Sequence, residues 1–220
     1  MIKNTKQLRP LKMLPLKSYT GVNDLDPIRY YSFPIIGKMY RERVQRCLAE
    51  CTGGEHILEI GFGTGLTFLN LKDMYQNIHG LDLTVDVNPI HELFLEHGVD
   101  TQLQNGSVLS MPYEDNYFDT VLLISILEHL KPDELTKAFQ EIHRVLKPGG
   151  QVIYGVPVER PFMVFMFRLL GHNIRDEHFS TEEDVYTHAK ILFKEIARIV
   201  MPGIPAFFGP VYQVGHFQKP

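Results

Sequence analysis

Residues 57–66 read ILEIGFGTGL, an apolar run that leads into three glycines spaced at every second position from 61 to 65. The apolar run is typical of a buried strand, and the spacing of Leu66, Leu69 and Met74 predicts a helix after the glycines. Glycine at a strand-to-helix turn lets the backbone approach a ligand closely and leaves helix N–H groups free. The stretch therefore predicts the ligand-binding turn of a β-α-β unit.

Strand and helix patterns alternate along the rest of the chain. Strands are predicted at 56–60, 78–82, 101–104, 118–124, 151–156, 194–201 and 211–218, and helices at 35–50, after the glycines, at 89–97, at 132–146 and from about 181. Asn88 is expected to cap one helix, and Ser180 with Glu183 to form a capping box for another. This alternation predicts an α/β fold with a mostly parallel sheet, helices on both faces and ligands at the carboxyl ends of the strands.

Composition limits the classes of function. The 220 residues, 44% of them hydrophobic, fit one domain over 1–220. A formal net charge of −4 disfavours nucleic acid as a partner. The lysines of the first stretch precede the first acidic residue, Asp24, and we interpret that stretch as a solvated, partly mobile tail. No apolar run is long enough for a transmembrane segment and no signal peptide is evident, so we expect a cytoplasmic protein.

Local spacing gives no sign of a metal or disulfide site. His91-Glu92 followed by His97 does not have the spacing of H-E-x-x-H. Cys47 and Cys51 suit neither a CxxC pair nor a usual disulfide. We therefore predict no metal site.

The chemistry around the glycines points to one cofactor. The dinucleotide pattern G-x-G-x-x-G is not met, because Leu66 stands where its third glycine belongs, and there is no P-loop lysine. A carboxylate at Glu59 would repel phosphates and attract a cation. Asp82 lies about 20 residues beyond Gly61, the distance at which an acidic side chain reaches a ribose diol in Rossmann-type units. A ligand that combines a nucleoside with a positive charge and has no phosphate is indicated, and S-adenosylmethionine is the cofactor with these properties.

Five blocks together resemble a known family. They are EIGFGTG at 59–65, Asp82, NGSVLSMPYEDNYFDTV at 105–121, LEHL at 127–130 and EIHRVLKPGG at 141–150. They are similar to the class I S-adenosylmethionine-dependent methyltransferases, in particular the type 11 branch that includes the ubiquinone and menaquinone biosynthesis enzymes. The resemblance covers about 55–157. It implies a Rossmann-like three-layer α/β/α sandwich with a seven-stranded, mostly parallel sheet and an antiparallel last strand.

The resemblance also implies the cofactor contacts. They are Glu59, Gly61, Phe62, Gly63 and Gly65 at the methionine end, Asp82 at the ribose, Leu83, Ser107 and Val108 at the adenine, and Ile124 and Ser125 facing the sulfonium. Relatives usually have Asp where this chain has Ser107, so the adenine contact departs from the family pattern. The glycines have a second interpretation, in which they serve only a tight turn.

Two histidines are the candidate catalytic residues. Methyl transfer rests mainly on alignment, and only some acceptors need a general base. His129 and His178 could supply it. The alternatives are a capping or structural role for Glu128 and His129, and a surface loop for His178.

The acceptor is expected to be a small apolar molecule. The place after the fourth predicted strand reads ISIL instead of the Asn/Asp-Pro-Pro-Tyr/Phe of base-amine methyltransferases. Apolar segments at 161–170 and 202–210 would line the mouth of the site, or else form a homodimer contact. Two other functions stay open, a non-catalytic S-adenosylmethionine-binding protein acting as a sensor or subunit, and a nicotinamide-dependent oxidoreductase.

The parts outside the resemblance are assigned to substrate access. Residues 158–193 form the variable substrate region. Residues 1–40 are a tail and possible lid that brings Tyr30 or Tyr31 near the cofactor, and we expect 1–33 to be dispensable for the fold.

Overall fold

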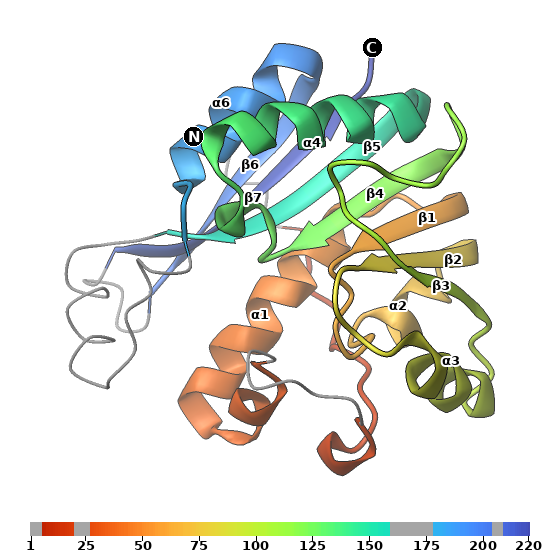
Figure 1. The fold of residues 1–220 in the computed structure, drawn as a ribbon. Helices are drawn as coiled ribbons and strands as arrows, with labels where there is room; N and C mark the ends of the chain where they lie inside the picture. Colours follow the sequence, from red (N-terminus) through yellow and green to blue (C-terminus); the bar gives the residue numbers. More distant parts are fainter. Residues whose placement is uncertain (1–5, 20–26, 159–177, 204–208) are drawn as a thin grey trace.

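The computed structural model describes residues 6–19, 27–158, 178–203 and 209–220. Seven strands form one sheet in the order β3-β2-β1-β4-β5-β7-β6 (Figure 1). Strand β7 is antiparallel to both of its neighbours, and the other pairs are parallel. The strands are β1 (Gly54–Ile60), β2 (Tyr75–Asp82), β3 (Thr101–Asn105), β4 (Phe118–Ile124), β5 (Leu146–Pro157), β6 (Lys194–Pro202) and β7 (Pro210–Gln218). The predicted fold class is confirmed.

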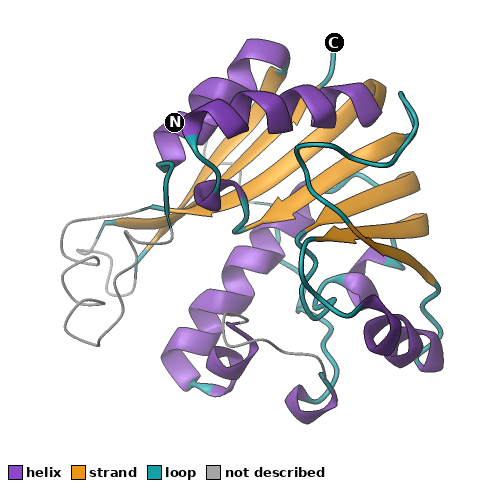
Figure 2. Cartoon of the chain, in the orientation of Figure 1, coloured by secondary structure: helices purple, strands orange, loops and turns teal. Residues whose placement is uncertain are grey.

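Helices cover both faces of the sheet (Figure 2). One face carries α1 (Pro34–Glu50), α2 (Phe68–Leu71) and α3 (Val87–Glu96), and the other carries α4 (Pro132–Val145) and α6 (Glu182–Leu192). Short 3-10 helices lie at η1 (Leu16–Ser18), η2 (Pro27–Ser32) and η3 (Leu127–His129). None of the helices in the described part of the chain has both the length and the apolar character to cross a membrane.

Apolar periodicity explains how these layers pack. Helix α4 turns one face to the sheet, where Leu135, Phe139 and Ile142 are buried at the i, i+4, i+7 spacing of a helix. Every residue of β4 from Thr120 to Leu123 is buried, as expected of a strand covered on both faces. The two faces of the sheet thus form two hydrophobic clusters, one under each helical layer.

The expected helix caps differ from those in the structure. The capping box of α6 uses Thr181 and Asp184, one residue later than predicted, because the Ser180 hydroxyl donates instead to the Leu130 carbonyl at 2.5 Å. At α3 the N-cap is Asp86, whose carboxylate accepts from the Asn88 N–H at 3.3 Å. In each case the predicted element is present and its first residue is shifted.

The described part of the N-terminal stretch is held against the domain, so the prediction of a solvated tail is wrong for residues 6–19. Lys6 forms an ion pair with the buried Glu50 at 2.8 Å, and the Lys12 N–H donates to the Asn70 side chain at 2.9 Å. The described side chains before α1 that are buried in the core are Leu14, Tyr19, Ile28 and Tyr31. Because they are buried, the expectation that 1–33 is dispensable for the fold no longer holds.

Candidate active site

The candidate site lies where the chain connections of the sheet change direction. Strands β1 and β4 are parallel neighbours, with Ile60 paired to Leu123, yet β1 leads to β2 on one side and β4 leads to β5 on the other (Figure 1). Such a switch point leaves a crevice at the carboxyl ends of the two strands. The glycine turn after β1 and Ser125 after β4 therefore lie at the same switch point, and we refer to the candidate site there as the crevice.

The glycine turn has a backbone that other residues rarely adopt. Gly61, Gly63 and Gly65 have φ values of +70°, +51° and +73°. An added Cβ at Gly61 would lie 2.0 Å from Cδ1 of Ile126, and one at Gly65 would lie 2.6 Å from the ring of Phe94. These glycines therefore serve the turn and its packing, whatever ligand the turn also holds.

Phe62 takes part in the core rather than in the crevice. Its side chain is 4% exposed, and its ring lies 5.7 Å from that of Phe68. Its carbonyl accepts from the Gly65 N–H at 2.8 Å, which closes the turn. Phe62 can thus face a cofactor only through its backbone.

Asp82 joins the ends of β1 and β2. One oxygen of its carboxylate accepts from the Gly63 N–H at 3.0 Å, and the other accepts from the Thr84 N–H at 3.1 Å. The side chain of the next residue, Leu83, is 70% exposed, so its apolar surface is open to a ligand. The predicted ribose and adenine contacts thus adjoin the glycine turn.

The loop after β3 lies beside this end of β2. The Gly106 N–H donates to the Asp82 carbonyl at 3.0 Å, and the Asn105 amide donates to the Val85 carbonyl at 2.8 Å. Val108 is buried, and the Ser107 hydroxyl accepts from the Leu109 N–H at 3.2 Å. Ser107 therefore has a structural bond in its own turn, which leaves its hydroxyl hydrogen for a ligand.

The side chain of Glu59 is buried beneath the glycine turn and is not exposed at the entrance of the candidate site. It is 4% exposed, and the Thr67 hydroxyl donates to its carboxylate. Burial raises the pKa of Glu59 to about 8; the hydrogen bond from Thr67 opposes this shift and the charge of Asp82 adds to it. A cation brought to this carboxylate would favour its ionised form.

The end of β4 is strained and tied to β7. Ser125 has a φ of +59°, which is rare for a residue with a side chain. Its hydroxyl lies 3.0 Å from the Tyr212 hydroxyl, and its N–H donates to the Gly155 carbonyl at 2.8 Å. Together with the half-buried Ile124, Ser125 ends at the crevice opposite the glycine turn.

The structure brings the two candidate catalytic histidines together. The rings of His129 and His178 lie 5.1 Å apart at 74°. Glu128 joins them, and each of the three side chains offers one ligand-type atom within 4.8 Å of the others. The sequence identified the two histidines as candidates but did not predict their contact. His129 is the last residue of η3 and His178 precedes α6, so the two lie in separate segments that only the fold brings together.

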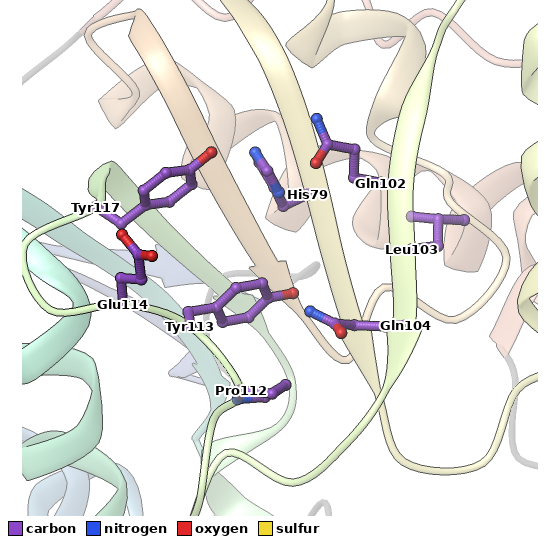
Figure 3. A pocket seen from close by; sticks show the side chains of 8 residues that line it. All are labelled: His79, Gln102, Leu103, Gln104, Pro112, Tyr113, Glu114 and Tyr117. Carbon is purple, nitrogen blue, oxygen red and sulfur yellow. The ribbon is translucent and has the colours of Figure 1, made fainter.

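A separate pocket of about 400 Å³ lies outside the predicted site (Figure 3). Its walls come from β2, β3 and the loop before β4, and include His79, Gln104 and Tyr113. Burial lowers the pKa of His79 to about 4, with a smaller contribution from His56. No residue predicted to bind the cofactor or acceptor lines this pocket.

Comparison with known proteins finds sequence similarity to methyltransferases over the part of the chain that contains the glycine turn. Residues 58–154 match the family model described as "Methyltransferase domain". The chain is 27% identical to the uncharacterized methyltransferase YcgJ of Bacillus subtilis over 163 residues. This alignment covers 70% of this chain and 64% of YcgJ. It is 33% identical over 140 residues to demethylmenaquinone methyltransferase of Bacillus licheniformis, covering 62% and 56% of the two chains.

A solved structure has the same fold. N-methyltransferase NodS from Bradyrhizobium japonicum, in complex with S-adenosyl-L-homocysteine, superposes with a TM-score of 0.66 at 18% identity and covers 93% of this chain and 96% of NodS. The chain spans less than two thirds of the length of the curated relatives it matches. These comparisons confirm the resemblance to methyltransferases of the type 11 branch and its extent along the chain.

Proposed function

We propose that this protein is an S-adenosylmethionine-dependent methyltransferase that acts on a small apolar molecule. The observation that carries the proposal is the position of the family match. Residues 58–154 include the glycine turn, Asp82 and Ser125, which the fold brings to one crevice at the switch point of the sheet. All the proposed cofactor contacts thus lie within the stretch that is similar to methyltransferases.

The donor set of the crevice fits this cofactor. Asp82 presents a carboxylate to a diol, Leu83 offers an exposed apolar side chain to a flat base, and Glu59 carries a carboxyl that a nearby cation would ionise. The proposed contacts are those the resemblance implies, with Phe62 acting through its backbone. The S-adenosylhomocysteine bound to NodS supports the same assignment.

In the proposed reaction, residues of this chain position the methyl group, and a histidine accepts a proton. The bound cofactor supplies a methyl group on a sulfonium, which reacts by displacement. The glycine turn and Ser125 would hold the methyl group in place, and alignment of this kind supplies much of the rate. His129 and His178 are the proposed groups on the acceptor side, where a neutral imidazole would take a proton from an acceptor hydroxyl.

The preference for an apolar acceptor rests on the apolar segments 161–170 and 202–210. Val158 and Gly203 are the last described residues before the gaps at 159–177 and 204–208, and both lie beside β7. The Val158 N–H donates to the Val211 carbonyl at 3.0 Å, and the Gly203 N–H donates to the Gly209 carbonyl at 2.7 Å. The apolar side chains of 161–170 lie outside the described residues, as do those at 204–208. The name demethylmenaquinone methyltransferase, which the relative from Bacillus licheniformis and several others carry, agrees with an apolar acceptor.

Binding and turnover test the proposal. Calorimetry should detect S-adenosylmethionine and S-adenosylhomocysteine in the micromolar range and no binding of NADH, which would separate this function from an oxidoreductase. A screen of apolar and quinone-like acceptors with methyl-labelled cofactor should then give a labelled product. Cofactor binding without transfer to any acceptor would favour the alternative, a non-catalytic S-adenosylmethionine-binding protein.

The acceptor class is tested separately by Phe165→Ser combined with Phe207→Ser. We expect slower turnover of apolar acceptors with unchanged cofactor affinity and unchanged mass by light scattering. Leu95→Ser, which changes an exposed apolar side chain of α3, is the control and should keep full turnover. A double variant that becomes monomeric and keeps its turnover would assign these aromatics to a homodimer contact.

A cytoplasmic location stays a prediction.

A further inference from the structure

The cluster of Glu128, His129 and His178 has a composition that general acid-base chemistry alone does not require. Two imidazoles and one carboxylate present one ligand-type atom each, all within 4.8 Å of one another. In a tetrahedral zinc site, ligand atoms bound at about 2.0–2.2 Å from the ion lie roughly 3.3–3.6 Å from one another. Side-chain rotations that shorten the distances between the three atoms by roughly 1 Å would therefore bring them around one ion.

The backbone holds the two parts of the cluster together. The Glu128 carbonyl accepts from the Phe179 N–H at 2.9 Å and from the Ser180 N–H at 3.2 Å. The Ser180 hydroxyl donates to the Leu130 carbonyl at 2.5 Å. These three hydrogen bonds join η3 to the segment before α6, so the backbones at His178 and His129 are held near each other by the fold.

The burial of the three side chains suits an open ion site. Glu128 is 3% exposed, His178 is half-buried and His129 is exposed. The cluster thus has a buried carboxylate at its base and imidazoles toward the solvent. Sites that bind a metal through three protein ligands keep further coordination positions for water or substrate.

We propose that Glu128, His129 and His178 bind a divalent transition-metal ion such as Zn²⁺ at the acceptor side of the crevice. Imidazole ligands select Zn²⁺, Fe²⁺ or Ni²⁺ over Mg²⁺, which prefers oxygen. The proposal departs from the expectation of no metal site, which considered only residues close in sequence. Here one ligand comes from a segment far from the other two.

The role of the ion rests on the proposed methyltransferase function. Histidines bound to the ion no longer serve as the base, and an acceptor hydroxyl coordinated to the ion instead loses its proton to solvent, because the positive charge stabilises the oxygen anion. That oxygen forms a bond to the methyl carbon as the carbon–sulfur bond breaks. The products are a methyl ether and neutral S-adenosylhomocysteine, with one proton released.

Titration of metal-free protein with ZnCl₂ tests the site. Wild-type protein, stripped with a chelator, should bind Zn²⁺, and excess MgCl₂ should not displace it. His129→Ala and His178→Ala should each bind one Zn²⁺ fewer per chain or bind it at least about tenfold more weakly, since even the loss of a group that only supports a ligand costs about 10–100-fold. His97→Ala removes the exposed histidine that caps the C-terminus of α3 and is the matched control. Thermal unfolding should show that all variants are folded.

The outcomes separate this inference from the proposed function. Wild-type protein that takes up no Zn²⁺, or histidine variants that bind it as the His97→Ala control does, would overturn the metal site. A parallel titration with S-adenosylmethionine tests the cofactor. Cofactor binding without Zn²⁺ binding refutes only the metal site, and Zn²⁺ binding without cofactor binding refutes only the proposed function.

Discussion

The carboxylate of Asp82 accepts a hydrogen bond from the backbone N–H of Gly63 at 3.0 Å, which links the end of β2 to the glycine turn after β1. The predicted ribose-binding side chain is thus also a support of the turn that is expected to hold the methionine end. The two parts of the proposed cofactor site should respond together when either is changed.

Asp82→Ala should weaken S-adenosylmethionine binding more than tenfold. Loss of hydrogen bonds from a charged acceptor costs about 1.5–3 kcal/mol, and the turn also loses its support. Calorimetry measures the affinity. Asp86→Ala is the control, because it removes a carboxylate from the same loop that only caps α3; it should cost about 1 kcal/mol of stability and leave the affinity unchanged. Equal affinities for folded Asp82→Ala and wild type would rule out the cofactor assignment.

Gly65→Ala should destabilise the fold more than Gly149→Ala. Both glycines have φ above +70°, so alanine costs about 1–2 kcal/mol of backbone strain at either position. At Gly65 the new Cβ also meets the rings of Phe94 and Phe68, which adds about 1–3 kcal/mol of overpacking, whereas at Gly149 it meets nothing within 4 Å. Urea unfolding compares the two. Similar losses of stability would mean that the rings move aside at little cost.

The affinity for S-adenosylmethionine should rise with pH through the pKa of Glu59. The folded pKa of about 8 lies above the ordinary value of 4.5, so Glu59 is protonated in the free protein below pH 8. A sulfonium favours the ionised form, so binding releases a proton, and the affinity should rise by up to about tenfold per pH unit until the pH passes the folded pKa.

The comparison ligand for this pH dependence is S-adenosylhomocysteine, which lacks the sulfonium charge and should show a flatter profile. Glu59→Gln should remove the difference between the two ligands. Calorimetry in buffers of different ionisation enthalpy measures the released proton directly. A Glu59→Gln protein with the wild-type profile would mean that another group is titrating.

The N-terminal segment should contribute to stability. Leu14→Ala should cost about 2–5 kcal/mol, the usual range for a buried leucine, although position 14 lies outside the family match. Leu95→Ala, at an exposed leucine of α3, should change stability by less than about 0.5 kcal/mol. Denaturant unfolding gives both values. A Leu14→Ala protein as stable as Leu95→Ala would return residues 6–19 to the status of a tail.

Cofactor binding should slow hydrogen exchange in residues 27–40 if they act as a lid. Tyr31 is buried, and its carbonyl accepts from the Arg41 side chain at 2.6 Å, so the segment is already attached to α1. A ligand beneath it would reduce its local opening further. Residues 182–192 of α6 provide an internal reference on the other face of the sheet. Equal exchange in 27–40 with and without cofactor would remove the lid from the mechanism.

The sequence by itself determined the strands of the sheet and the glycine turn, and it named the candidate residues at the ends of the strands. Hydrophobic periodicity and turn residues are local, so β4 at Phe118–Ile124 could be predicted to the residue, and the glycines and Asp82 could be assigned from their position after β1 and β2. Boundaries set by distant partners were less predictable. The α6 cap moved from Ser180 to Thr181 because the Ser180 hydroxyl bonds to Leu130.

Only the tertiary structure decided which side chains meet. Ser125 reaches Tyr212 across 87 residues, Glu50 meets Lys6 and His216, and His178 joins Glu128 and His129. No periodic pattern records such contacts, because they depend on how separate elements pack and not on the preferences of either segment alone. For the same reason the sequence could name the two histidines as candidates but could not predict that a carboxylate joins them in one cluster.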